Sequence, residues 1–193
     1  MASANRVVSS ESEELILVDE NDNEIGHLSK ALAHDGGGTL HRAFSVFLFN
    51  DKGELLLQRR AASKRLWPQF WSNSCCSHPR RGESMELATQ RRLQDELNVH
   101  AELEFVYKFS YQADFGGLGS ENELCHIYLG KNDGDVQAND HEVDSIRFLS
   151  VADLEAEFES RREQFTPWFL MEWQALRTSY QEKLLRYLGT QPT

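Results

Sequence analysis

The stretch from Ser77 to Val99, SHPRRGESMELATQRRLQDELNV, decides the fold. Residues 86–97 within it contain neither Gly nor Pro and are rich in helix formers. Gly82 and Ser84 lie just before them and are a plausible start signal. We therefore predict a helix over 86–97 that carries many charged side chains, and the segments on either side of it indicate what it packs against.

The bulk composition limits the class of protein. A hydrophobic share of 40% and a charged share of 26% over 193 residues are ordinary for one soluble domain with a full core. The net charge of −11 argues against nucleic acid or an anionic membrane as a partner held by bulk charge. The odd count of 3 cysteines fits a reducing compartment. No apolar run resembles a signal peptide or approaches the ~20 residues of a membrane span, so we expect a cytoplasmic protein.

Local patterns predict a mixed α/β (α+β) domain. Residues 1–13 are rich in Ser and Glu and are expected to form a disordered leader, followed by a single domain over 14–190. Strands are predicted at 15–18, 43–49, 55–57, 107–111, 123–129 and 146–149, with 43–49 and 55–57 forming a buried hairpin. Strands and helices do not alternate regularly enough for a doubly wound sheet.

Two further helices are predicted towards the end of the chain. One covers 151–162. The other starts with Thr166 as its cap and Pro167 at its first position, carries an apolar stripe at three- and four-residue steps, and ends at Gly189.

Three histidines and two glutamates are candidate metal ligands. Glu121 and Glu123 are two residues apart on a predicted strand, so both face one side. With His34, His41 and His78 they would make a plausible octahedral site for Mn²⁺, Mg²⁺ or Zn²⁺. Each signal is weak alone, because a single His is usually a surface or core residue and a Glu-x-Glu pair is usually a solvated strand face.

A thiol lies two residues before one of these histidines. Cys76 and His78 stand within the segment WSNSCCSHP, residues 71–79, and a nucleophilic Cys–His pair is the first interpretation. Cys75 is the competing thiol. Neighbours on a strand point to opposite faces, and the two-residue spacing to His78 selects Cys76.

Cations gather where the global charge is negative. Lys30, Arg59, Arg60 and Lys64, together with Arg92, are suited to phosphate oxygens. A solvated loop is an equally good interpretation of the run from 59 to 65 taken alone.

The spacing of the opening stretch resembles the Nudix box, the loop–helix–loop of diphosphate-processing enzymes. The matched positions are Ser77-x5-Glu83-x7-Arg91-Arg92-Leu93-x-Asp95-Glu96-x-Asn98-Val99. Ser77 and Asn98 stand where the box has Gly, and Arg92 and Asp95 stand where it has Glu. Arg92 replaces a metal-binding carboxylate with a fixed cation, which disfavours a hydrolase and favours a site that holds a diphosphate. An ordinary charged helix with Arg92 and Glu96 paired would be favoured if the box stood alone.

A longer ordered set of motifs resembles the type 1 isopentenyl-diphosphate Δ-isomerases of the Nudix superfamily. It covers about residues 15–175. The matching stretches are Lys30-x3-His34-x6-His41, Leu57-x-Arg59-Arg60-x3-Lys64-x2-Trp67-Pro68, Trp71-Ser-Asn-Ser-x-Cys76-x-His78-Pro79, Arg91-Arg92-x3-Glu96-Leu97, Glu121-Asn122-Glu123 and Thr166-Pro167-Trp168.

The resemblance implies a Nudix-like mixed sheet sandwiched between helices and a role in isoprenoid precursor biosynthesis. The implied reaction converts isopentenyl diphosphate to dimethylallyl diphosphate by protonation and deprotonation through a carbocation. Cys76 and Glu123 would be the proton-transferring pair, with Tyr111 beside the glutamate and Trp168 facing the carbocation. Which group gives the first proton stays open.

The resemblance also implies the ligands. One divalent ion (Mn, Mg or Zn) would be held by His34, His41, His78, Glu121 and Glu123. A second ion, Mg²⁺, would join Glu96 to the substrate diphosphate, which Lys30, Arg60, Lys64 and Arg92 would clamp.

Two other functions compete with this interpretation. A Nudix hydrolase would release phosphate from diphosphate substrates, and a non-catalytic diphosphate-binding or metal-storage module would have no use for the thiol. We expect a small-molecule substrate, no nucleic-acid or membrane partner, and a monomer or weak homodimer.

Overall fold

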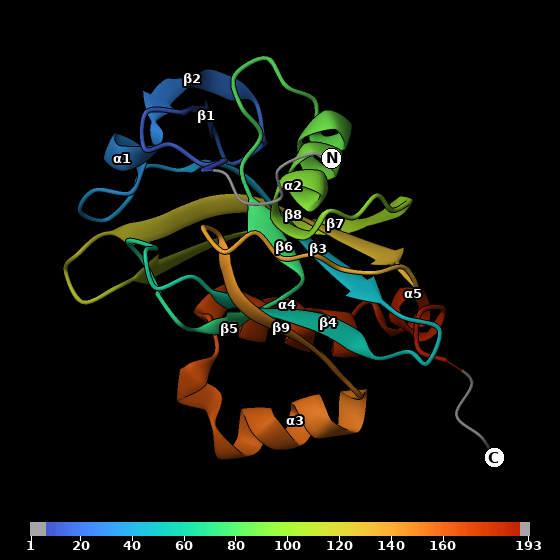
Figure 1. The fold of residues 1–193 in the computed structure, drawn as a ribbon. Coiled ribbons are helices and arrows are strands. Elements are labelled where there is room, and N and C mark those ends of the chain that lie inside the picture. Colours follow the sequence, from blue (N-terminus) through green and yellow to red (C-terminus); the bar gives the residue numbers. More distant parts are fainter. Residues whose placement is uncertain (1–6, 190–193) are drawn as a thin grey trace.

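The computed structural model describes residues 7–189 as a mixed sheet with helices on both faces (Figure 1). Residues 1–6 of the expected leader and residue 190 of the expected domain lie outside the described residues. The strands are β1 (Glu14–Val18), β2 (Glu24–Ser29), β3 (His41–Phe49), β4 (Leu55–Arg60), β5 (Trp71–Ser72), β6 (Cys75–Ser77), β7 (Leu103–Asp114), β8 (Ser120–Lys131) and β9 (Val143–Leu149). The helices are α1 (Lys30–Ala33), α2 (Met85–Leu97), α3 (Val151–Ser160), the 3₁₀ turn η1 (Arg162–Gln164), α4 (Pro167–Thr178) and α5 (Gln181–Leu185).

Strand β3 organises the sheet. It runs parallel to β8 from His41 opposite Glu123 to Phe49 opposite Lys131, and its other edge pairs antiparallel with β6. Strand β8 also forms a long antiparallel hairpin with β7. The first residues of β3 and β8 therefore lie side by side at one end of the sheet.

The predicted hairpin between 43–49 and 55–57 is wrong beyond its turn. β3 and β4 pair only at Phe49 and Leu55, and β4 then pairs with β5 and β9. The edges of β3 are already occupied by β8 and β6, so β4 must diverge from it.

Alternation along β3 divides the core into two layers. Phe44, Val46 and Leu48 pack on the side of α2, whereas Phe47 and Phe49 pack on the side of α4. Figure 1 shows α2 on one face of the sheet and α3 and α4 on the other. The expected mixed sheet between helices is confirmed. Within residues 7–189, none of the helices is both long and apolar enough to cross a membrane.

The helix predicted from the opening stretch is confirmed as α2, starting one residue earlier than expected. The Ser84 hydroxyl accepts from the backbone N–H of Leu87 at 3.3 Å and caps the helix. Asn98 adopts the left-handed conformation with φ of 55° and ends it. Arg92 and Glu96 lie on the buried face of this helix, which points one ion pair into the protein.

The last predicted helix is broken in two. Pro167 does begin α4, but that helix ends at Thr178. The ring of Tyr180 stacks on Tyr107 at 4.3 Å, which anchors the chain to β7 before α5 begins. The Thr166 hydroxyl makes no cap hydrogen bond and instead lies 3.0 Å from the Ser72 hydroxyl. The helix predicted over 151–162 ends at Ser160 and is followed by η1.

Candidate functional site

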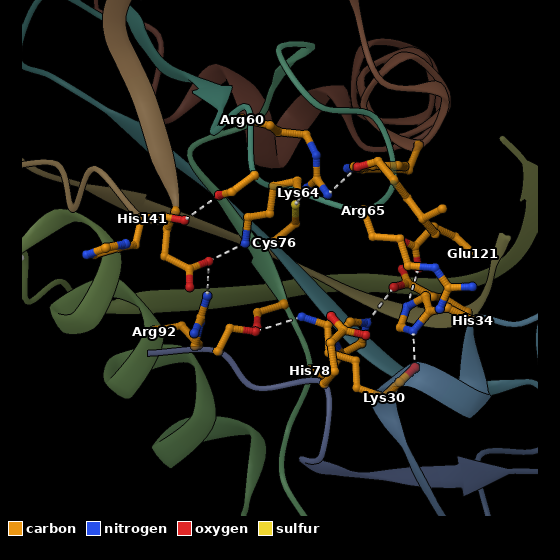
Figure 2. Close-up of a pocket in the computed structure, with 18 of the residues that line it drawn as sticks. Lys30, His34, Arg60, Lys64, Arg65, Cys76, His78, Arg92, Glu121 and His141 are labelled. Carbon is orange, nitrogen blue, oxygen red and sulfur yellow. Dashed lines mark hydrogen bonds and ion pairs between the residues drawn. The ribbon is translucent and has the colours of Figure 1, made fainter. Parts of the chain in front are cut away.

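A cavity of about 290 Å³ opens at the end of the sheet where β3 and β8 begin. In Figure 2, His34 and Glu121 lie on one side of it, Arg92 and His141 on the other, and Cys76 between them. Its lining residues are contributed by segments from the N-terminus to α4. The cavity thus has two chemically different sides, which are described in turn.

The five predicted metal ligands meet at one side of the cavity. We call them the histidine–glutamate cluster, and their nearest donor atoms all lie within 4.8 Å of one another. His34 follows α1, His41 opens β3, His78 follows β6, and Glu121 and Glu123 lie on β8. The β3–β8 register places His41 directly opposite Glu123. Strand pairing thus brings residues distant in sequence to a common point.

Backbone carbonyls fix the orientation of two imidazoles. Nδ1 of His34 lies 2.7 Å from the carbonyl of Lys30, and Nδ1 of His41 lies 2.7 Å from the carbonyl of Thr39. Because a carbonyl only accepts, each Nδ1 carries a proton, and Nε2 is the ring nitrogen that faces the cluster. Nε2 of His41 is buried without a hydrogen-bond partner. A divalent ion bound among these atoms would satisfy it.

Both glutamates are buried carboxylates with partners inside the cluster. Oε1 of Glu123 lies 2.8 Å from Nε2 of His78, and Oε2 accepts a 2.6 Å hydrogen bond from the Tyr111 hydroxyl. Oε2 of Glu121 lies 2.7 Å from Nε2 of His34. Burial alone would raise the pKa of Glu121, but His34 brings it below its ordinary value. Two carboxylates with three imidazoles fit a dication in charge and donor type.

Cys76 lies on β6 opposite Ser45 of β3 and lines the cavity. Burial raises the pKa of its thiol to about 12, so the thiol is protonated near neutrality. A guanidinium N–H of Arg60 lies 3.8 Å from its sulfur. Cys75 is fully buried in the core on the α2 side, as strand alternation predicted.

An aromatic wall stands beside the thiol. Trp168 in the first turn of α4 is buried, and its indole N–H donates to the Ser72 hydroxyl at 3.1 Å. The Arg60 guanidinium carbon lies 5.2 Å from the centre of the Trp168 ring. The Trp67 ring packs edge-on against the Trp168 ring, with 5.2 Å between the two ring centres. These contacts hold the indole against the cavity.

The second side of the cavity is cationic, and we call Lys30, Lys64 and Arg92 the cation group. Lys64 and Arg92 form ion pairs with the same carboxylate, that of Glu142, which lies 3.1 Å from Arg92 Nη2. These partners lower the pKa of Glu142 to about 2 despite its burial. Arg60 also lines the cavity, through the contacts with Cys76 and Trp168 already described. The fifth cation considered from the sequence, Arg59, instead pairs with Asp144 at 3.7 Å.

Glu96 lies behind the cation group. Its Oε1 accepts from Nε of Arg92 at 2.9 Å, and the side chain is 3% exposed. Arg92 lines the cavity, whereas Glu96 is not among the described residues that do so. The pair predicted for an ordinary charged helix therefore forms, but it is buried.

Val8 and Ser9, in the described part of the expected leader, contact the cation group. The Ser9 hydroxyl accepts from Lys30 Nζ at 2.7 Å, and the Val8 carbonyl accepts from Arg92 Nη1 at 3.2 Å. Burial, together with Lys64 and Arg92, lowers the pKa of Lys30. Two chain oxygens thus occupy donors that were predicted to hold phosphate.

Ser9, Glu142 and Glu172 are among the polar residues at or near the cavity that sequence reasoning missed. No local pattern marks Ser9 or Glu142, because each makes its contact with a segment far along the chain. Glu172 does carry a signal. It lies one turn after Trp168 and one turn before Leu176, on the buried stripe of the helix.

Comparison with known proteins bears on the family. The NUDIX domain model matches residues 39–169. The isopentenyl-diphosphate Delta-isomerase of Serratia proteamaculans is 46% identical over 174 residues, 90% of this chain and 97% of that protein. Isopentenyl-diphosphate Delta-isomerase 1 of Photorhabdus laumondii is 42% identical over 174 residues, 89% of this chain and 99% of that protein.

Solved structures bear on the fold alone. A protein from Deinococcus radiodurans superposes with a TM-score of 0.64 at 24% identity, covering 77% of this chain and 90% of that one. A Nudix hydrolase from M. smegmatis superposes with a TM-score of 0.52 at 17% identity, covering 86% of this chain and 94% of that one.

Proposed function

The chain belongs to the NUDIX-domain family and, within it, to the isopentenyl-diphosphate Delta-isomerases, and from this premise we propose that it converts isopentenyl diphosphate to dimethylallyl diphosphate. The observation that carries the proposal is the cavity itself. It combines a half-buried protonated thiol, a carboxylate hydrogen-bonded to a tyrosine, and a group of cations within about 290 Å³.

The cavity supports a mechanism of proton addition and proton removal. Cys76 and Glu123 both line it and are the two groups that exchange protons with the allylic carbons. Tyr111 donates to Glu123 and orients its carboxylate. Trp168 turns its ring to the cavity, and an aromatic face stabilises a nearby carbocation. The buried walls keep water from capturing that cation.

The cation group with Arg60 binds the diphosphate in this proposal. Ammonium and guanidinium donors match phosphate oxygens, and Arg92 presents a planar fork from α2. Lys30, Lys64 and Arg92 must then exchange their chain partners for the substrate. Until the diphosphate arrives, those chain partners hold the cations in place.

We propose that the histidine–glutamate cluster holds one divalent ion, Mn²⁺, Mg²⁺ or Zn²⁺. When bound, this ion fixes the five side chains and tunes the basicity of Glu123. A second ion, Mg²⁺, is proposed to join Glu96 to the diphosphate. Glu96 would have to share its carboxylate between that ion and Arg92, its partner in the structure.

Isomerisation in D₂O tests the reaction directly. We expect dimethylallyl diphosphate to form and deuterium to enter at C2 or C4, as followed by NMR and mass spectrometry. Rapid phosphate release with no allylic product would instead identify a Nudix hydrolase. Tight binding of isopentenyl diphosphate with neither product would identify a non-catalytic binding module.

Location and assembly complete the proposal. We propose a cytoplasmic enzyme, which the three free cysteines support, that acts on a small molecule as a monomer or weak homodimer. Light scattering of the purified protein at micromolar concentration measures the oligomeric state.

A further inference from the structure

A second carboxyl group lies buried close behind the cavity and has no part in the mechanism above. Glu172 on α4 is fully buried within the core on the α4 side of the sheet. Its Oε1 accepts from the Ser45 hydroxyl at 2.7 Å and from the Cys125 thiol at 3.6 Å. Its Oε2 is buried without a hydrogen-bond partner.

This arrangement does not serve packing. A buried polar atom without a partner costs free energy, and an apolar side chain of the same shape often stabilises such a position. Burial raises the pKa of Glu172 to about 8, so the group is largely uncharged at neutral pH and no ion pair repays the burial. A role in function accounts for a carboxyl group placed there.

The partners of Glu172 show what that role is. Ser45 on β3 is directly opposite Cys76 on β6, so both side chains leave the same face of the sheet. Cys125 lies two residues after Glu123 on β8 and points to the same face as Glu123.

Helix α4 connects Glu172 to Trp168. Trp168 lies one turn before Glu172 and on the same side of the helix. The carboxyl group thus joins α4 to the two strands that carry the reacting groups.

We propose that Glu172 is a positioning residue, whose hydrogen bonds to Ser45 and Cys125 set the place of Trp168 relative to Cys76 and Glu123. This inference rests on the proposed isomerase function. It concerns the turnover of bound substrate, because Glu172 is not among the described residues that line the cavity. The uncharged form is sufficient, since an acceptor oxygen facing Ser45 is all that the contact requires.

The test compares Glu172→Gln, Glu172→Met and Ser45→Ala by steady-state kinetics with isopentenyl diphosphate. Gln keeps the acceptor, and we expect kcat within about threefold of wild type. Met and the Ser45→Ala variant remove the hydrogen bond, and we expect kcat to fall about tenfold with KM within about twofold, since small misplacements in an active site are costly. The variant with both Glu172→Met and Ser45→Ala should fall no further than Glu172→Met alone, because both changes remove the hydrogen bond between Ser45 and Glu172.

Urea unfolding separates positioning from stability. Glu172→Met should unfold at the same or a higher urea concentration than wild type, so lower kcat would not reflect a weaker fold. Leu176→Met, one turn later on the same buried face, is the matched control and should leave kcat unchanged.

Two results would overturn the inference. Wild-type kcat in both Glu172→Met and Ser45→Ala would show that turnover does not depend on the hydrogen bond between Ser45 and Glu172. An equal loss in Glu172→Gln would show that a titrating proton is needed rather than an acceptor. Failure of the wild-type protein itself to isomerise would instead count against the proposed function.

Discussion

The two sides of the cavity are prepared for their ligands in opposite ways. In the histidine–glutamate cluster, backbone carbonyls orient two of the imidazoles, and Nε2 of His41 has no hydrogen-bond partner. In the cation group, each cation already contacts an oxygen of the chain, from Ser9, Val8, Glu96 or Glu142. We call the histidine–glutamate cluster the open side, because a donor atom of His41 faces it without a hydrogen-bond partner. We call the cation group the closed side, because oxygens of the chain already contact its cations.

The difference follows from the charge of each side. The cluster offers two carboxylates and three imidazoles, so a dication completes it. Three cations packed together without anions would repel one another and would be costly to bury. Carboxylates and chain oxygens stabilise them until a diphosphate replaces those partners. We therefore expect substitutions on the open side to change kcat and metal binding, and substitutions on the closed side to change stability and KM by smaller amounts.

The largest expected effects are on the reacting groups. Cys76→Ala and Glu123→Gln should each lower kcat by about a thousandfold or more, because each removes one proton-transferring group. The two variants should differ in metal binding. A divalent ion at about 100 times its Kd should raise the free energy of unfolding of wild type and Cys76→Ala by about 2.7 kcal/mol, and that of Glu123→Gln by much less.

Chelation provides the companion measurement. Metal-free wild type should lose isomerase activity and recover it with a divalent ion, and circular dichroism should show folded protein throughout. Turnover in metal-free protein, or substantial activity in Cys76→Ala, would contradict the assignment of this side.

The sequence predicted the open side far better than the closed one. Glu121 and Glu123 share a face because a strand repeats every two residues, and alternation likewise separates Cys76 from Cys75. The pairing of β3 with β8 that brings His41 to Glu123 carries no comparable local signal. The sequence grouped His41 with Glu123 through their donor types and the resemblance, and did not predict this strand pairing.

The closed side depends on contacts that no spacing indicates. Lys64 finds Glu142 across the fold, and the hydroxyl of Ser9 reaches Lys30 from a segment predicted as a leader. The same reason explains the errors in the fold. Stacking of Tyr180 on Tyr107 breaks a helix whose local pattern is continuous, and the partners of β3 separate it from β4.

The next effect in size concerns Glu142. Glu142→Gln should lower the free energy of unfolding by about 3 kcal/mol at neutral pH, because it removes the buried carboxylate that pairs with Lys64 and leaves Arg92 with Glu96 as its carboxylate partner. The same change frees Lys64 and removes one of the partners of Arg92, so KM for isopentenyl diphosphate should fall about threefold to fivefold, an effect of about 1 kcal/mol. Stability would decrease while binding improves.

The contribution of Glu142 to the free energy of unfolding should depend on pH in a definite direction. The pKa of Glu142 falls from 4.5 to about 2 on folding, so its stabilisation is complete above pH 4.5 and is lost as the pH approaches 2. Urea unfolding should show the difference between wild type and Glu142→Gln, about 3 kcal/mol at pH 6, shrinking through pH 4 and 3.

A more exposed ion pair is the matched control. Glu157→Gln removes the partner of Arg147 and should cost less than about 1 kcal/mol without a change in KM. A rise in KM for Glu142→Gln would contradict the view that chain carboxylates compete with the diphosphate.

The smallest effect should come from Ser9. Ser9→Ala removes one hydroxyl from Lys30 and leaves the neighbouring Val8 carbonyl on Arg92. Water can take the place of one neutral hydroxyl beside Lys30, so we expect a net change of about 0.7 kcal/mol or less, which means that KM should fall by no more than about threefold and that kcat should not change. Ser9→Thr keeps the hydroxyl and is the control, with KM expected at the wild-type value. If Ser9→Ala raised KM, Ser9 would contact the substrate directly, and the cation group would be an incomplete site awaiting its ligand rather than one closed by the chain.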